Sequence, residues 1–262
     1  MPTSVRKVVA ASPTAAWANF WAGSKPGSTN AGNIYRWDGK VWARIRTGAA
    51  GETTELLKAV PAAGSIPGMA WVKLVQINTK GVASQTLLLC DAAKCTAQRA
   101  AGTTGTYPGS FLTPGGFDAA SSKLALVWEV LPGNNPNKTT VALLQFNGAK
   151  WTAVMKVNVQ HVQQGVDYMG EPKYVHSPEL LVSIGSSTNA VALLAHQLPV
   201  ASKTGTLVTH TWNGAKWAQQ ANATFEKGQD PAFESAGQVH QLQALSSGTA
   251  LLTLFSGMWR LA

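Results

Sequence analysis

The chain has 262 residues, of which 45% are hydrophobic and 13% are charged, so it can bury a sizeable globular core. Ala, Gly, Thr, Ser, Val and Leu dominate, a composition that indicates strands and turns, and no apolar run is long enough to cross a membrane. Lys and Arg outnumber Asp and Glu by 21 to 12, and the net charge of +9 favours anionic partners. The basic residues are scattered, which argues against a nucleic-acid-binding stripe.

Four short β-prone runs make up the first part of the chain, separated by residues typical of turns. We expect strands at 5–12, 15–23, 33–37 and 41–45. The last two are joined by an Asp-Gly turn typical of tight hairpins, with Trp37 before the turn and Trp42 after it. Opposed aromatic side chains of this kind stabilise a hairpin by roughly 0.2–1 kcal/mol.

The same hairpin signature occurs three more times. Its paired positions are Cys90 and Cys95, Phe146 and Trp151, and Trp212 and Trp217. The first members of successive pairs lie roughly 53, 56 and 66 positions apart, a period typical of repeat proteins built from four-stranded units. We therefore expect the first unit to cover about residues 5–50, and the next three to cover about 51–104, 105–160 and 175–224.

Two cysteines replace both aromatic residues of the second hairpin, and the chain has no others. Directly opposed hairpin residues approach to about 4.5–5.5 Å, which suits a disulfide. We predict a Cys90–Cys95 disulfide and an extracytoplasmic location: secreted, periplasmic or at the cell surface. A pair of reduced thiols is the alternative. The first residues lack an apolar core of signal-peptide type, so we expect a removed signal or unconventional export.

The end of the chain resembles its beginning. The stretch that starts at Val239 aligns with the one that starts at Val5, so a fifth unit covers about residues 237–262 and stops after three strands. These units predict an all-β fold: a single-domain, five-bladed β-propeller of four-stranded antiparallel blades over residues 1–262. The last blade is either incomplete or closed by contact with the N-terminal residues, which would protect its edge. A pair of β-sandwiches is the alternative.

Units that carry Trp-(Asp/Asn)-Gly-x-x-Trp resemble those of β-propeller proteins, among them small propeller lectins and sialidase-like propellers. The Asp-box of sialidases places a residue between its Asp and Gly, whereas here Asp38-Gly39, Asn147-Gly148 and Asn213-Gly214 are adjacent. The resemblance implies the propeller fold, and no catalytic residue is carried over from it.

The aromatic hairpins are candidates for ligand binding, because tryptophan faces stack on sugar rings and a lysine lies at each turn. The candidates are Trp37, Trp42, Trp151, Trp212 and Trp217. The alternative is a structural role, since the cysteine copy can hold its hairpin together without an aromatic face. Other tryptophans stand in the second strand of their units, and we predict that they lie in the core between blades. These are Trp17, Trp21, Trp71 and Trp128.

Two long connections, 159–179 and 225–241, both read Asp-x-x-x-Glu followed by Val-His. They supply further candidate ligand-binding residues: Tyr168, Glu171, His176, Asp230, Glu234 and His240. In propellers such loops surround one mouth of the central channel, where carboxylates can act as general acid and base or hold a divalent cation. The alternative is two related turns with ordinary capping acids.

The sequence contains no nucleophile elbow, phosphate loop, HExxH motif, dinucleotide fingerprint or EF-hand loop. Dispersed histidines and a single cysteine pair also argue against a metal site. We expect a non-catalytic binding propeller that recognises a glycan or an anionic surface ligand, without a cofactor. One alternative is a structural protein that docks a protein partner of an envelope or filament. The other is a glycosidase-like enzyme that uses Asp167, Glu171, Asp230 and Glu234.

Overall fold

A computed structural model describes the larger part of the chain, in which the fold is all-β with hardly any helix. The described residues are 5–20, 32–64, 67–104, 106, 108–113, 115–134, 138–160, 162–166, 172–175, 179–196, 204–220, 223–226, 239–244, 250–254 and 257–261. Within these ranges, no helix is long and apolar enough to cross a membrane.

Five antiparallel sheets follow one another along the chain. The first contains β1 (Val5–Ser12), β2 (Ala15–Phe20), β3 (Ile34–Trp37) and β4 (Trp42–Arg46). The second contains β5 (Glu52–Val60), β6 (Met69–Ile77), β7 (Ala83–Cys90) and β8 (Cys95–Ala100). The third contains β10 (Phe117–Ser121), β11 (Leu124–Val130), β12 (Lys138–Phe146) and β13 (Trp151–Gln160), with β9 (Ser110–Phe111) paired to β11.

The fourth sheet contains β16 (Glu179–Ser186), β17 (Asn189–His196), β18 (Thr204–Trp212) and β19 (Trp217–Gln219), with β20 (Ala223–Glu226) paired to β18. The last sheet contains β21 (Val239–Ala244), β22 (Ala250–Leu254) and β23 (Gly257–Leu261). A separate two-stranded sheet joins β14 (Val162–Val166) and β15 (Pro172–Val175). In the five main sheets the strands numbered in chain order are neighbours in space. The strands predicted for the first unit correspond to β1–β4, and the end of the chain forms three strands as expected.

All four predicted hairpins close in the same way. An Asp or Asn side chain accepts hydrogen bonds of 2.7–3.1 Å from the backbone N–H groups two and three positions later. These residues are Asp38, Asp91, Asn147 and Asn213. The predicted pairs are direct cross-strand partners: Trp37 and Trp42, Cys90 and Cys95, Phe146 and Trp151, and Trp212 and Trp217. The hairpin prediction is therefore confirmed.

Three of these turns require glycine. Gly39, Gly148 and Gly214 have φ values of +100°, +91° and +91°, in the left-handed region that side chains disfavour. A Cβ at Gly39 would also lie 2.8 Å from Cγ2 of Thr14, and one at Gly214 would lie 2.9 Å from Cγ2 of Thr188. Both threonines belong to the turn between the first and second strands of the same sheet, so the two turns of a sheet pack closely together.

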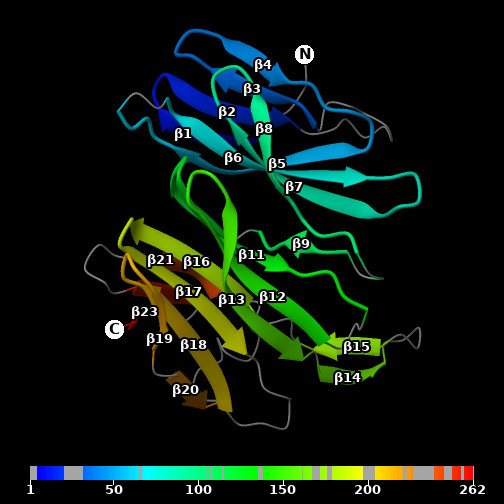
Figure 1. Cartoon of the computed structure of the whole chain (residues 1–262), viewed down its shortest axis with the longest axis vertical. Coiled ribbons are helices and arrows are strands. Elements are labelled where there is room, and N and C mark those ends of the chain that lie inside the picture. The colour runs from blue at the N-terminus through cyan, green and yellow to red at the C-terminus, as the bar shows by residue number, and fades with distance from the viewer. Residues whose placement is uncertain are drawn as a thin grey trace.

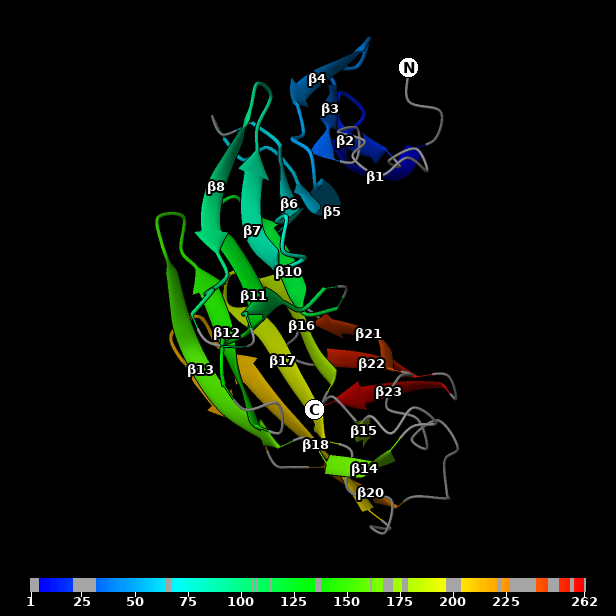
Figure 2. The same cartoon turned by 90° about the vertical axis from the view of Figure 1, so that its right-hand side faces the viewer.

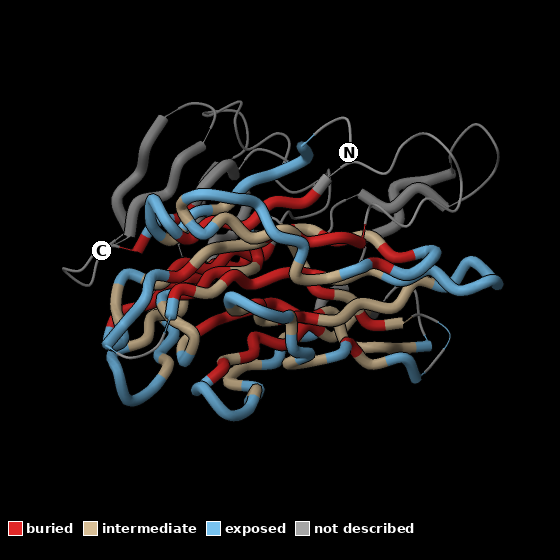
Figure 3. Tube along the Cα trace, turned by 90° about the horizontal axis from the view of Figure 1, so that it is seen from above, coloured by how far each residue is buried: buried red, intermediate tan, exposed pale blue. Residues whose placement is uncertain are grey.

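The five main sheets are stacked along an arc (Figures 1 and 2). Their first strands lie on the inner side of the arc, and each packs against the first strand of the next sheet: β1 on β5, β5 on β10, β10 on β16, and β16 on β21. The first and last sheets form the two ends of the arc, and no extensive packing joins their described strands. The buried residues lie in layers between neighbouring sheets (Figure 3).

Large aromatic side chains fill these layers. Trp17, Trp71 and Trp128 are fully buried, which confirms their predicted place in the core, whereas Trp21 lies outside the described residues. Trp17 packs against the second sheet, and the indole N–H of Trp128 donates to the carbonyl oxygen of Leu181 in the fourth sheet at 3.2 Å. Neighbouring sheets are thus held together by apolar burial, to which directed hydrogen bonds such as that of Trp128 are added.

Candidate functional site

A cavity of about 560 Å³ lies among the inner strands of the second to last sheets. It is lined by Lys58 of β5, by Phe117 and Asp118 of β10, and by segments of β16 and β21 that include Ser183 and Gln243. This volume is within the range of about 300–1,000 Å³ found for ligand sites. Because four sheets contribute to its wall, the cavity exists only when the sheets are assembled.

Asp118 joins three of these sheets at the wall of the cavity. Its carboxylate forms an ion pair with Lys58 of the second sheet. One carboxylate oxygen accepts from the backbone N–H of Ala119 at 2.8 Å, and the other accepts from the N–H of Ile184 in the fourth sheet at 2.7 Å. The carboxylate is largely buried, with 12% of the side chain exposed. Its acceptor capacity is thus occupied by the protein itself.

The same kind of bond recurs one sheet further along. The hydroxyl of Ser183 accepts from the backbone N–H of Ala244 in the last sheet at 3.0 Å. Asp118 and Ser183 both stand three residues before a serine that ends the inner strand. At this position, therefore, β10 and β16 each provide an acceptor for a backbone N–H of the next inner strand.

Close backbone approach shapes the wall on either side of these bonds. Gly115 has a φ of +88°, and a Cβ there would lie 2.5 Å from a methyl group of Leu181. Its carbonyl oxygen accepts from the backbone N–H of Val182 at 2.9 Å. The N–H groups of Val182 and Ile184 therefore both point away from the rest of their sheet. The N–H and C=O groups of one strand residue point to the same side of the strand. The carbonyls of Val182 and Ile184 therefore also face the open edge of β16.

Among the described residues that line the cavity, Lys58 is the one charged group with donors to spare. Its side chain is 44% exposed, and an ammonium group has three N–H donors, of which the ion pair with Asp118 uses one. The wall therefore offers a cation, hydroxyl and amide groups, and backbone carbonyls. Such a surface suits a ligand that is rich in hydroxyl groups and carries an acidic group, and the described lining residues include no arrangement typical of a nucleophile and its base.

The predicted aromatic candidates do not line this cavity. Phe146 and Trp151 have ring centroids 5.2 Å apart and both contact Trp71, so this pair belongs to the layer between the second and third sheets. In the fourth sheet, the Trp212 and Trp217 rings are 5.9 Å apart and pack against the core shared with the third sheet. Both pairs therefore take part in the packing between sheets, and ligand binding by Trp151, Trp212 and Trp217 stays a prediction.

The pair in the first sheet differs. Trp37 and Trp42 have ring centroids 5.6 Å apart, and the Trp37 indole N–H donates to the carbonyl oxygen of Pro13 at 3.1 Å. Trp42 is 43% exposed. Of the five predicted tryptophans, this one therefore presents a large accessible aromatic surface.

The remaining predicted ligand-binding residues cannot be placed. Tyr168, Glu171, His176, Asp230 and Glu234 lie outside the described residues, as does Asp167. His240 belongs to β21, of which the structure describes only the backbone at that position. Among the described residues, no group of three His, Cys, Asp or Glu side chains is arranged to hold a metal ion. The glycosidase alternative stays a prediction.

The cavity residues Lys58, Asp118 and Ser183 were not among the sequence candidates. The signal that could have found Asp118 and Ser183 is the serine that ends their strands; β5, which carries Lys58, ends in Val60 and offers no such signal. Aligning the units on Ser121 and Ser186 places Asp118 and Ser183 in one row, although the stretches share few other residues.

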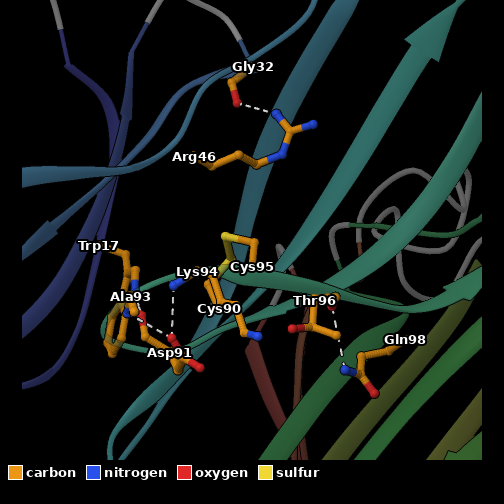
Figure 4. The surroundings of a disulfide bond; sticks show 10 residues. All are labelled: Trp17, Gly32, Arg46, Cys90, Asp91, Ala93, Lys94, Cys95, Thr96 and Gln98. Carbon is orange, nitrogen blue, oxygen red and sulfur yellow. Dashed lines mark hydrogen bonds between the residues drawn. A yellow bond between two sulfur atoms is a disulfide. The ribbon is translucent and has the colours of Figure 1, made fainter.

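The predicted disulfide is confirmed. Cys90 and Cys95 are bonded, with their Cα atoms 3.9 Å apart. Trp17 of the first sheet lies beside this hairpin, and its indole N–H donates to the carbonyl oxygen of Asp91 at 3.3 Å (Figure 4). The disulfide therefore takes the place of an aromatic pair in the layer between two sheets. Comparison with known proteins gives no further assignment, since neither a protein-family model nor a curated protein matches the chain.

Proposed function

We propose that the protein is a non-catalytic binding module whose central cavity binds a carbohydrate that carries an acidic group. The observation that supports this most directly is the polar wall around Lys58, whose ammonium keeps donors directed away from Asp118. A carboxylate or sulfate group on a sugar would accept these donors, and charge-assisted bonds of this type are roughly twice as strong as neutral ones. The net charge of +9 would also attract such a ligand.

We also propose that the five main sheets are the blades of one β-propeller domain, with their inner strands around the cavity. The consecutive packing of β1, β5, β10, β16 and β21 supports this. Closure of the ring by contact between the two ends of the chain stays a prediction. The disulfide supports an extracytoplasmic location, where carbohydrate ligands of cell surfaces are accessible.

Calorimetric titration with an oligogalacturonate and with a neutral oligosaccharide of equal length tests the ligand class. We expect the acidic sugar to bind and Lys58→Gln to weaken its binding by about tenfold or more, since a charge-assisted hydrogen bond contributes roughly 1.5–3 kcal/mol. Lys80→Gln, at an exposed turn, is the matched control and should bind as the wild type does. Equal binding of the neutral sugar, or an unchanged affinity in Lys58→Gln, would count against the proposal.

A variant of the first hairpin tests whether the ligand binds in the cavity or on the exposed aromatic pair. Trp42→Ala should leave acidic-sugar binding intact if the cavity is the site. If this variant loses binding and Lys58→Gln keeps it, the ligand binds the exposed aromatic pair instead.

A further inference from the structure

The turn of each outer hairpin carries one lysine. In all four turns the backbone N–H of this lysine donates to the Asp or Asn side chain that begins the turn, at 2.8–3.0 Å. All four lysines are exposed. Each side chain therefore reaches solvent from a backbone position that the turn fixes. The residues are Lys40, Lys94, Lys150 and Lys216.

The turns of neighbouring sheets lie beside one another. Trp17 of the first sheet donates to the carbonyl oxygen of Asp91, in the turn of the second sheet. Trp151, which directly follows the turn of the third sheet, packs against the second sheet. Trp217 holds the same place in the fourth sheet and donates to Gln145, two residues before the turn of the third. The turns thus follow one side of the arc, and those of β7–β8 and β12–β13 both point upward in Figure 2.

The third sheet adds a second lysine on this side. Lys123 lies in the turn between β10 and β11, and a Cβ at Gly148 would lie 3.0 Å from the Cγ of Lys123. The turn of Lys123 therefore packs against the turn of Lys150, and both side chains are exposed. We call the five lysines of these turns the lysine row: Lys40, Lys94, Lys123, Lys150 and Lys216.

Few carboxylates lie near the lysine row. Asp38 and Asp91 begin the first two turns, but Asn147 and Asn213 take their place in the third and fourth sheets. None of the five lysines forms an ion pair with another described residue. The positive potential is therefore strongest over the third and fourth sheets. Their turns at this end contain three lysines and no Asp or Glu: 121–123, 147–150, 186–188 and 213–216.

The groups between the lysines indicate what kind of anion fits. The side-chain oxygens of Asn147 and Asn213 accept backbone N–H groups, so each exposed amide keeps its NH2 group as a donor. Serine and threonine hydroxyls occupy the turns beside them. The same four turns contain no large apolar side chain that could enter a bilayer, and no aromatic side chain on which a base could stack. Such a surface suits a partner with both acidic groups and hydroxyl groups.

We propose that the lysine row binds a linear acidic polysaccharide that runs across the sheets. Packed sheets lie about 10 Å apart, so a chain that crosses four of them spans about 30 Å or more. The proposal rests on the proposed function for its ligand class, but it uses other residues, since none of the five lysines lines the cavity. One acidic sugar fills the cavity, whereas the row makes affinity depend on chain length through several weak contacts.

Calorimetric titration with a short oligogalacturonate and with a polygalacturonate that can span four sheets tests the proposal. We expect the long chain to bind more tightly, with an affinity that falls as salt rises. A variant without four lysines of the row should bind the long chain about thirtyfold more weakly, since each exposed charge pair contributes a factor of roughly 2–3. The short chain should bind this variant as it binds the wild type. The variant combines Lys94→Gln, Lys123→Gln, Lys150→Gln and Lys216→Gln.

A control variant removes the same charge from exposed positions outside the turns of the row. It should bind the long chain as the wild type does. Both variants keep the backbone bonds of the four turns, and circular dichroism checks that both are folded. The control combines Lys7→Gln, Arg44→Gln, Lys80→Gln and Lys156→Gln.

Three outcomes would overturn the proposal: a long chain that binds no more tightly than the short one, an unchanged affinity in the row variant, or an equal loss in the control. Single-stranded DNA or anionic vesicles that bind more tightly than polygalacturonate, and lose binding in the row variant, would overturn the assignment to a carbohydrate. Lys58→Gln separates the two sites. If the cavity binds no sugar, the short chain does not bind, while the long chain still distinguishes the row variant from the wild type.

Discussion

Replacing Asp118 by Ala is expected to lower the free energy of unfolding by about 2–4 kcal/mol. The larger contribution comes from the charge-assisted bond to the N–H of Ile184, which is worth roughly 1.5–3 kcal/mol and leaves a part-buried donor unpaired when it is removed. The ion pair with Lys58 contributes at most about 1 kcal/mol, because the lysine side chain is 44% exposed and water screens it.

Urea unfolding followed by tryptophan fluorescence measures these differences, since Trp17, Trp71 and Trp128 are buried between sheets. Lys58→Ala should cost less than about 1 kcal/mol, because it removes the ion pair and leaves the bond to the neighbouring sheet in place. Asp118→Asn keeps one acceptor oxygen, so its loss of unfolding free energy should lie between those of Lys58→Ala and Asp118→Ala. If Lys58→Ala destabilises the protein as much as Asp118→Ala does, then the ion pair holds the sheets together and the reasoning from the Ile184 bond is wrong.

Three further predictions follow from single features. Reducing the Cys90–Cys95 disulfide should lower stability by about 2 kcal/mol, the loop entropy of so short a ring, and intact mass should show two thiols that react only after reduction. Glu55 forms an ion pair with Lys73. Burial acts to raise the pKa of Glu55, but the hydrogen bond and the charge of Lys73 outweigh this effect and lower the pKa from 4.5. The ionised form therefore stabilises the fold above about pH 4.5, this stability is lost as pH falls through the lowered pKa, and Glu55→Gln should make acid unfolding less steep. Gly214→Ala should cost about 1–2 kcal/mol in thermal unfolding through its positive φ alone, whereas Gly133→Ala, with open space around the glycine, should change stability little.

The hairpins were predictable because everything that determines them lies within six residues. In Trp37–Trp42 the turn residues, the Asx hydrogen bonds and the opposed side chains are all local, so the sequence shows both the turn and the pair. The same holds for Cys90 and Cys95, whose pairing follows from their places in the repeat. Local chemistry of this type is independent of how the sheets are packed.

The cavity could not be predicted in the same way, because its wall depends on the register between sheets. Lys58 and Asp118 are 60 positions apart, and the partner of Asp118 in the fourth sheet is a backbone N–H that carries no sequence signature. Sequence analysis favoured aromatic side chains, whose chemistry is conspicuous, over a single acid in a glycine-rich stretch. Phe146 and Trp151 lie against Trp71 in the contact between sheets, and a role of Trp151 in ligand binding stays a prediction.

The repeated contact between neighbouring sheets also builds the wall of the cavity. Within the chain, the contact between sheets has an apolar part on the hairpin pair and a polar part at the inner strand, where Asp118 and Ser183 accept a backbone N–H. The polar parts of successive contacts lie side by side around the cavity, so packing the sheets also builds its wall. A substitution in the row of Asp118 should therefore change stability and cavity together.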